Sequence, residues 1–304
     1  MGTRLFTDYT EVNAAKKTDY LLIHDGAGVK KISKEHFLTE DAIALALADG
    51  TYKGVDLTIK FADEIANFTD AWAWIQNRLD TDNIADLHIH DYIPFTCMGE
   101  NHQAQIAGKD TYYNTGDTLV GHHIDFISRD CLSTTVQFNT TNNNNGNATK
   151  QSPFLASNLK AWLDGTVYPT LDASLKAVIK AKRILAPWRY QSGTTLNDDN
   201  YWGWENFDKL WVPLETEIFE CLVWSTKGFG NGQAVQYPIF ANSYNARMKG
   251  AGPGGSRTYW WTASATSGNS TTCVHVTGYG NSTNYSASDA LRVPVCFRLI
   301  KNAA

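Results

Sequence analysis

Residues 273–299 read CVHVTGYGNSTNYSASDALRVPVCFRL, and this stretch decides how the fold closes. Apolar residues alternate through its last part, which predicts a core strand with Val293, Val295, Phe297 and Leu299 on one face. Because an isolated strand is not stable in water, this strand must pair with strands from earlier in the chain. The uncharged segment before it would then be held at both ends and displayed at the surface.

The composition of residues 262–288 indicates what such a surface is for. Ser, Thr, Asn, Gly and Tyr make up 20 of these 27 residues, and Lys, Arg and Glu are absent. Strands predicted in TYWWTAS (258–264) and CVHVTGYG (273–280) leave two polar loops, ATSGNSTT (265–272) and NSTNYSASDA (281–290). Antibody paratopes combine Tyr, as rigid contact area, with small polar residues that adapt their hydrogen bonds. The sequence therefore favours a ligand-binding surface, and an ordinary pair of solvated loops is the alternative.

The composition of the whole chain excludes several classes of function. Its 304 residues carry a formal net charge of −5 with a pI near 5.9, which argues against nucleic-acid binding. No apolar run approaches the length of a membrane span, and the N-terminus MGTRLFTDYT lacks the pattern of a signal peptide. Five cysteines without a CxxC pair indicate reduced, mostly buried thiols rather than a disulfide framework or a zinc site. Cys273 and Cys296 could pair only if their strands were neighbours.

Residues 1–50 predict a small hairpin followed by a helix. Tyr20–Ile23 and Val29–Ile32 are apolar strands around an Asp-Gly-Ala-Gly turn, and TEDAIALALA (39–48) has a helical pattern with Thr39 as its N-cap. These elements are too few to be stable alone, so we expect them to pack on another body, such as a sister chain.

Residues 51–152 read mainly as short strands and loops. Alternation predicts strands in VDLTIKF (55–61) and LHIHDYIPFTC (87–97), whereas DAWAWIQNRL (70–79) has the pattern of an amphipathic helix. The Asn-rich tract 138–152 predicts a loop that is embedded in the domain and is not a domain boundary.

The middle of the chain favours helices. Residues 157–183 predict two helices, capped by Ser157 and broken by Gly165 and Pro169. KLWVP (209–213) then predicts a short strand and LETEIFE (214–220) a helical turn. Grouped helices with strands on both sides indicate an α+β fold.

Candidate catalytic groups are sparse. His88, His90, His122 and His123 could ligate a metal if their segments met, and LHIHD would place the first two on one face of a strand. Fuller motifs such as HExxH are absent, which favours structural histidines. At helical spacing, Glu215, Glu217 and Glu220 are typical of a solvated face rather than an acid/base pair.

The glycine-rich stretch KGAGPGGSR (249–257) is similar to a phosphate-binding loop only in its glycine content. It lacks the Gly-Lys-Ser/Thr ending and contains a proline, so the pattern indicates a surface loop.

Four segments resemble C-type-lectin-like domains of bacteriophage and prophage proteins, and they occur in the usual order: LWVPLETEIFE (210–220), QYPIFA (236–241), YWWTAS (259–264) and VPVCFRL (293–299). One departure is Leu214, where that family usually has Ser. The resemblance implies an α+β, C-type-lectin-like fold over residues 51–304, with binding loops in 242–288. TDYLLIHDGAGVKKISKEHF (18–37) resembles the leader segments of phage tail and fibre proteins, which implies a virion-attachment or oligomerisation segment over 1–50.

Within that fold, the chain is most similar to the variable proteins of diversity-generating retroelements, whose binding residues precede the last strand. The resemblance implies a fixed scaffold of Trp260, Trp261, Val293, Val295 and Phe297. Carried over by position, the implied ligand-binding residues are Tyr244, Asn245, Asn269, Ser270, Thr271, Tyr279, Asn281, Thr283, Asn284, Tyr285 and Ser286. The Glu-Pro-Asn, Gln-Pro-Asp and Trp-Asn-Asp motifs of calcium-dependent lectins are absent, so we expect no calcium and no other cofactor.

These observations predict a non-catalytic receptor-binding protein of a phage tail or virion surface, assembled in the host cytoplasm. Its expected partners are a bacterial surface protein or glycan, other virion proteins through residues 1–50, and copies of itself in a homotrimer, with no nucleic acid and no membrane insertion. Two alternatives remain: a structural decoration or baseplate protein, and a metal-dependent enzyme that uses His88, His90, His122 and His123.

Overall fold

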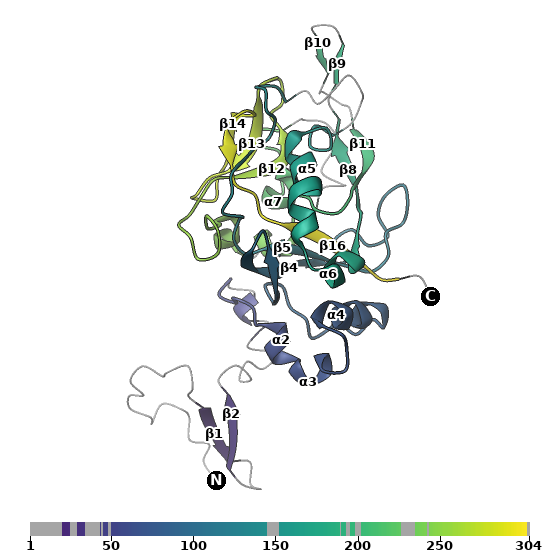
Figure 1. The fold of residues 1–304 in the computed structure, drawn as a ribbon, viewed down its shortest axis with the longest axis vertical. Helices are drawn as coiled ribbons and strands as arrows, with labels where there is room; N and C mark the ends of the chain where they lie inside the picture. The colour runs from purple at the N-terminus through teal and green to yellow at the C-terminus, as the bar shows by residue number, and fades with distance from the viewer. Residues whose placement is uncertain are drawn as a thin grey trace.

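The computed structural model describes residues 20–24, 29–33, 43, 45–47, 50–144, 152–188, 190–192, 195–197, 202–225, 235–241 and 243–302. Its centre is an antiparallel sheet of five strands, in the order β3–β4–β5–β16–β7 (Figure 1). Their bounds are β3 (Tyr92–Cys97), β4 (Glu100–Lys109), β5 (His123–Ser128), β7 (Ile179–Lys180) and β16 (Cys296–Ile300). The last strand thus lies between two strands from much earlier in the chain, which confirms the expectation that it pairs with them.

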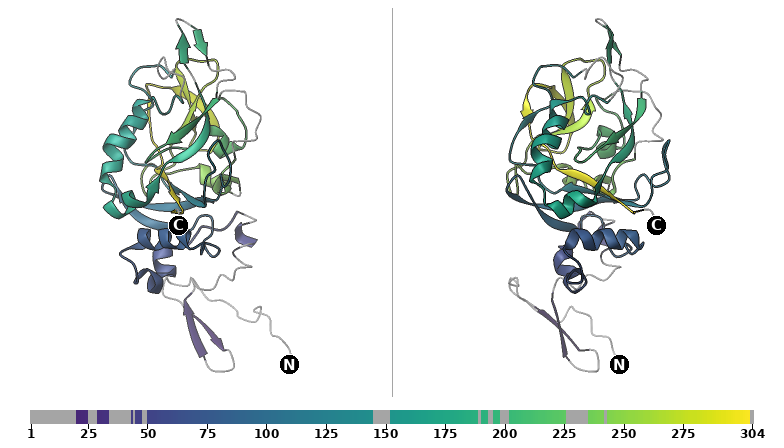
Figure 2. Two further views of the ribbon diagram at one scale, coloured as in Figure 1. Left: turned by 90° about the vertical axis from the view of Figure 1, so that its right-hand side faces the viewer. Right: turned by 45° about the vertical axis from the view of Figure 1, so that its right-hand side comes forward.

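One face of this sheet is covered by the helix α4 (Ala71–Asp80). The helix begins where the Asp70 carboxylate accepts hydrogen bonds from the backbone N–H groups of Trp72 and Ala73, so the amphipathic helix expected here is confirmed. Trp72 packs edge-on against Phe126 of β5 and Phe297 of β16, with ring centroids 5.9 and 5.6 Å apart. These rings close the core on the side of the sheet where α2, α3 and α4 lie (Figure 2).

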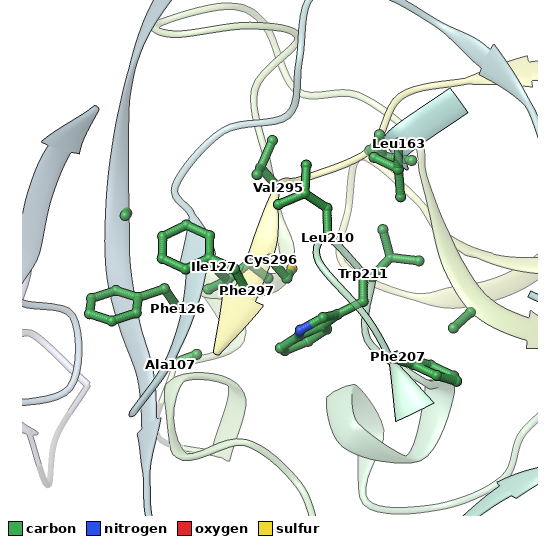
Figure 3. Close-up of a cluster of buried hydrophobic side chains, with 14 of the residues drawn as sticks. Ala107, Phe126, Ile127, Leu163, Phe207, Leu210, Trp211, Val295, Cys296 and Phe297 are labelled. Atoms are coloured by element: carbon green, nitrogen blue, oxygen red, sulfur yellow. The ribbon is translucent and has the colours of Figure 1, made fainter. Parts of the chain in front are cut away.

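The opposite face carries the rest of the apolar core (Figure 3). Trp211 is fully buried there, and its backbone N–H donates to the carbonyl oxygen of Cys296 at 3.0 Å. In place of the short strand expected over 209–213, the structure has a single bridge between these two residues. The side chains of Phe207, Leu210 and Val295 lie around the same cluster.

The fold mixes α and β structure, and strands predominate in it. A second antiparallel sheet has the order β12–β13–β14, with β12 (Trp260–Ala265), β13 (Thr272–Val276) and β14 (Ser282–Ser286). The remaining strands form pairs: β8 (Lys182–Pro187) with β11 (Trp202–Phe207), β6 (Val136–Gln137) with β15 (Ala290–Leu291), and β9 (Tyr190–Ser192) with β10 (Thr195–Asn197).

The helices are short, and two expectations about them are wrong. VDLTIKF does not form a strand, because the Asp56 carboxylate caps the backbone N–H of Thr58 and starts a helix. Gly165 does not break the helix that begins after the Ser157 cap; the chain continues through a π-helical turn at 163–167 and a 3₁₀ turn at 168–170. The other helices are α2 (Leu57–Lys60), α3 (Ala62–Ile65), α5 (Asn158–Trp162), α6 (Ala173–Val178), α7 (Glu215–Phe219) and α8 (Pro238–Ala241).

The N-terminal hairpin is present as expected. β1 (Tyr20–His24) pairs antiparallel with β2 (Val29–Ser33), and it lies at the opposite end of the molecule from β9 and β10 (Figure 1). Ile43 and residues 45–47 are helical, whereas the N-cap expected at Thr39 lies outside the described residues. No helix in the described part of the chain is long and apolar enough to span a membrane.

All five cysteines are free thiols, and four of them are buried. Cys273 lies in β13 and Cys296 in β16, which belong to different sheets, so the possible disulfide between them is not formed. Burial raises the pKa of Cys97 to about 11 and that of Cys131 to about 12, which keeps both thiols protonated and unreactive at neutral pH.

Candidate ligand-binding surface

The segment 281–290, expected to be a loop, contains the edge strand β14. Its five residues pair with β13 in continuous antiparallel register, from Ser282 opposite Val276 to Ser286 opposite Thr272. The segment has no apolar alternation, so pairing with the buried strand β13 determines its conformation. Side chains of an edge strand stand out from both faces of the sheet, and on β14 they are Ser, Thr, Asn and Tyr.

One end of this surface is the turn between β13 and β14. The Thr277 hydroxyl accepts hydrogen bonds from the backbone N–H groups of Tyr279 and Asn281 and thereby closes the turn. The Tyr244 hydroxyl donates to the carbonyl oxygen of Tyr279 and lies 3.0 Å from Asn281 Oδ1. Gly280 has a φ of +80°, and a Cβ there would lie 3.3 Å from the Tyr244 ring, so glycine permits this close approach. Three predicted binding residues therefore meet at this end.

The other end is the turn between β12 and β13. Asn269 Oδ1 accepts hydrogen bonds from the backbone N–H groups of Thr271 and Thr272. Asn144 is fully buried beneath the turn, where its amide donates to the carbonyl oxygens of Asn269 and Thr272. Asn144 belongs to the Asn-rich tract, so the described end of that tract is part of the packed structure.

A buried carboxylate anchors the middle of the surface. Glu215 is fully buried and accepts hydrogen bonds from the backbone N–H groups of Val223, Trp224 and Ser225. It also accepts hydrogen bonds from the hydroxyls of Ser225 and, on β14, Ser282. The indole N–H of Trp224 donates in turn to the carbonyl oxygen of Ser282. The partly exposed Trp224 ring is thereby fixed beside the edge strand.

The carboxylates expected on a solvated helical face are mostly buried. Glu215 and Glu217 are fully buried, and only Glu220 is exposed. The expectation of a solvated face is wrong because both buried carboxylates have hydrogen-bond donors inside the protein. Glu215 is bonded by the loop after α7, and Glu217 is bonded by Lys182, Tyr112 and the backbone N–H of Leu214.

Exposed aromatic rings lie along this surface. Tyr279 is 68% exposed, Tyr244 51%, and Tyr259 and Tyr285 each 43%. Tyr259 and Tyr285 both contact the buried ring of His275, at centroid distances of 5.4 and 5.5 Å. Neither nitrogen of His275 has a hydrogen-bond partner among the described residues. The exposed rings of Tyr259 and Tyr285 thus lie against the His275 ring, whose nitrogens are without hydrogen bonds to the described residues.

The predicted residues occupy three places along one hairpin and do not form a single cluster. Tyr244, Asn245, Tyr279 and Asn281 belong to one end, and Asn269, Ser270 and Thr271 to the other. Thr283, Asn284, Tyr285 and Ser286 lie on β14 between them, a strand that spans roughly 13 Å. All of them are exposed or half-buried.

Sequence reasoning missed Trp224 and Tyr259 as exposed members of this surface. Trp224 lies far from 262–288 in sequence and contacts β14 only in the folded structure, directly at Ser282 and through Glu215. Tyr259 belongs to YWWTAS, of which the resemblance assigns only Trp260 and Trp261, both to the scaffold. Those two rings are fully buried, whereas the ring of Tyr259 is exposed; its place near the start of the strand predicted over 258–264 is the available signal.

The histidines considered as metal ligands do not assemble such a site. His88 and His90 precede β3 in a turn and are not on a strand, and His90 has a φ of +79°. His122 pairs with Asp110 at 2.8 Å, and His123 hydrogen-bonds the Gly121 carbonyl and the Tyr112 N–H. Among the residues the structure describes, no three His, Cys, Asp or Glu side chains are grouped to hold a metal ion.

Burial of His275 predicts acid sensitivity. It lowers the pKa of His275 from an ordinary 6.5 to about 4. Above pH 6.5 this histidine is neutral in both the folded and the unfolded chain, so its titration does not reduce the free energy of unfolding. As the pH falls from 6.5 towards 4, the unfolded chain binds the proton first, and the free energy of unfolding decreases. We expect the melting temperature to fall between pH 7.5 and pH 4.5, and to fall less in His275→Phe, as measured by thermal unfolding. His90, His102 and His123 have lowered pKa values too, so the variant keeps part of the slope; an unchanged slope would contradict the assignment.

Comparison with known proteins places this surface inside a region that matches one family model. A family model described as a domain of unknown function (DUF6273) matches residues 125–301, more than half of the chain. The matched region runs from β5 to the end of β16 and includes the whole candidate surface. No curated protein and no solved structure matches the chain.

Proposed function

This chain belongs to the DUF6273 family of domains of unknown function, and we propose that it is a non-catalytic protein that binds a ligand through the hairpin β13–β14. The ligand is a protein or glycan of a bacterial surface, and the chain is the receptor-binding part of a phage tail or virion. Tyrosines supply the main contact area, and the Ser, Thr and Asn side chains between them adapt their hydrogen bonds to the ligand.

The observation that carries this proposal is the exposure of Tyr244, Tyr259, Tyr279 and Tyr285 around the well-anchored sheet β12–β13–β14. An exposed tyrosine is ordinary when it is alone, but several on an ordered surface make rigid, amphipathic contact area at little entropic cost. The anchors are the Thr277 turn, Asn144 and Glu215, so little backbone order would be lost on binding.

We further propose that the fold is of the C-type-lectin-like kind. Two features support it: the last strand β16 lies inside the central sheet, and the binding segment precedes that strand as an excursion into a second sheet. In the variable proteins of diversity-generating retroelements the binding residues have this position, so the same residues are proposed sites of variation here.

The N-terminal hairpin is the proposed attachment and trimerisation segment. A strand pair of this size is only marginally stable on its own, which gives it a reason to pack against a partner. Several copies on one virion would convert a weak single-site affinity into strong avidity.

The test is binding of the labelled full chain to a panel of intact bacteria and to a glycan array, with the oligomeric state read by light scattering. In Tyr279→Ala/Tyr285→Ala, the affinity for whichever target the wild type binds is expected to fall about tenfold or more, because two exposed aromatic anchors are removed.

Tyr113→Ala is the matched control. Tyr113 is also an exposed tyrosine, but it stacks on His122 in a different part of the molecule, so its loss should leave binding intact. Equal binding by the wild type and the double variant would instead support a purely structural role in the virion. Stoichiometric zinc or iron in the purified chain would favour the metal-dependent enzyme. Light scattering that reports a monomer would contradict the proposed trimer.

A further inference from the structure

A pocket of about 360 Å³ lies beside the candidate surface, and the proposed function does not use it. Its lining includes Tyr52, Lys53 and His90 and residues of the segment from Ser243 to Arg257. Asn245 belongs both to this lining and to the predicted binding residues. The volume is at the lower end of the range for small-molecule sites and suits a ligand the size of a monosaccharide.

The charges that line the pocket are mainly positive. Four cationic side chains contribute, and Asp130 provides the one carboxylate among the described lining residues; the cations are Lys53, Arg129, Lys249 and Arg257. The Asp130 carboxylate is engaged by the backbone N–H groups of Gly250 and Gly254, at 3.0 and 3.3 Å, which reduces what it can offer a ligand. The side chains of Lys53 and Arg257 make no hydrogen bond or ion pair with any described residue.

Lys249 lines the pocket as a buried residue and is not a surface charge. Its side chain is almost completely buried, and its ammonium group donates to the carbonyl oxygens of Ser128 and Arg129 at 2.7 and 3.2 Å. An ammonium group has three hydrogens, so one donor remains after these two bonds. A buried cation is unfavourable unless it is neutralised, and no carboxylate of the described residues bonds the Lys249 ammonium group.

The backbone around His90 has the strain typical of ligand sites. His90 adopts a left-handed conformation with a φ of +79°, which costs a non-glycine residue energy. Gly54 packs against it so closely that a Cβ at Gly54 would lie 1.9 Å from the His90 carbonyl oxygen. Burial, together with the positive charges of Lys53 and Lys249, lowers the pKa of His90 to about 4, so the imidazole is neutral at neutral pH.

We propose that this pocket is an oxyanion site, which binds the phosphate or carboxylate group of a small ligand of monosaccharide size. Lys53 and Arg257 close on the anion from the two rims, and the remaining Lys249 hydrogen meets it at the base. The stretch KGAGPGGSR thus supplies a lysine and an arginine to an anion pocket, although it is not a nucleotide-binding loop. The site adjoins the tyrosine surface at Asn245, but the proposal does not depend on the function of that surface.

The experiment is calorimetric titration of the full chain with three probes: inorganic phosphate, glucuronate and glucose. The wild type is expected to bind phosphate or glucuronate and not glucose, with an affinity that falls as sodium chloride is raised. In Lys53→Gln/Arg257→Gln, which changes two exposed side chains, the affinity for the anionic probe should fall at least tenfold. Binding of phosphate alone would identify the group as a phosphate, and binding of glucuronate alone as a carboxylate.

The charge-matched control is Lys180→Gln/Lys209→Gln, which removes two exposed cations outside the pocket and should bind as the wild type does. Three results would overturn the proposal: no binding of either anion by the wild type, equal loss in the control and pocket variants, or binding of glucose as strong as that of glucuronate. Circular dichroism of both double variants establishes that they are folded.

Discussion

Replacing Arg298 by Met is expected to lower the free energy of unfolding by about 3–5 kcal/mol, because it leaves the Asp125 carboxylate buried without its cationic partner. Both residues are fully buried, and Arg298 donates from Nε and Nη2 to the two oxygens of Asp125 at 2.7 and 2.6 Å. Tyr237 donates a further hydrogen bond to Asp125. Burial alone would raise the pKa of Asp125, but Arg298 outweighs it and holds the pKa below its ordinary range. Urea denaturation at neutral pH measures the loss.

The double variant Asp125→Leu/Arg298→Met separates the cost of the orphaned charge from the value of the pair. Removing both charges is expected to recover most of the stability, since a buried ion pair and an apolar pair of similar volume are often equivalent. A single variant that loses less than about 1 kcal/mol would show that water reaches Asp125.

Replacing Glu215 by Gln is expected to cost about 2–4 kcal/mol and to release the candidate surface from its anchor. Every group that bonds this carboxylate is a donor: three backbone N–H groups of residues 223–225 and the hydroxyls of Ser225 and Ser282. The amide of Gln has one acceptor oxygen, and its NH₂ group would face donors, so buried donors are left unsatisfied. Urea denaturation measures the stability, and the change in tryptophan emission that is lost when Trp224→Phe is added reports the loop, since the chain has ten tryptophans.

Glu220→Gln makes the same chemical change at the end of the same helix, where the side chain is exposed. It should alter stability by less than about 0.5 kcal/mol. An equal effect of the two substitutions would mean that Glu215 is not the anchor.

The parts of the fold that the sequence predicts are those with a local signal. The amphipathic pattern of 70–79 predicts α4, and alternation predicts the closing strand. Where two local signals compete, the prediction fails: residues 55–61 alternate like a strand, yet the Asp56 cap makes them helical. The pairing of Arg298 with Asp125 has no local signal at all, because 173 residues separate the partners.

The candidate surface follows the same rule. Composition was sufficient to locate the uncharged tyrosine segment, since the bias is continuous in sequence. It gave no indication that 282–286 is a strand, because these residues acquire their conformation from β13. The cations of the pocket come from three distant segments, around Lys53, Arg129 and 249–257, and meet only in three dimensions, so no single motif marks the set.

Asn144 grips the turn at residues 269–272 through carbonyl oxygens, a feature that every amino acid possesses. Ser270 is an exposed residue of this turn, and its carbonyl oxygen accepts a hydrogen bond from the backbone N–H of Asn144. Its side chain takes no part in that bond, so it can be replaced without weakening the anchor. Substitutions at position 270 can therefore change the side chain displayed at this turn while the hydrogen bonds beneath it are kept. Members of the family are expected to differ at position 270 far more often than at position 144.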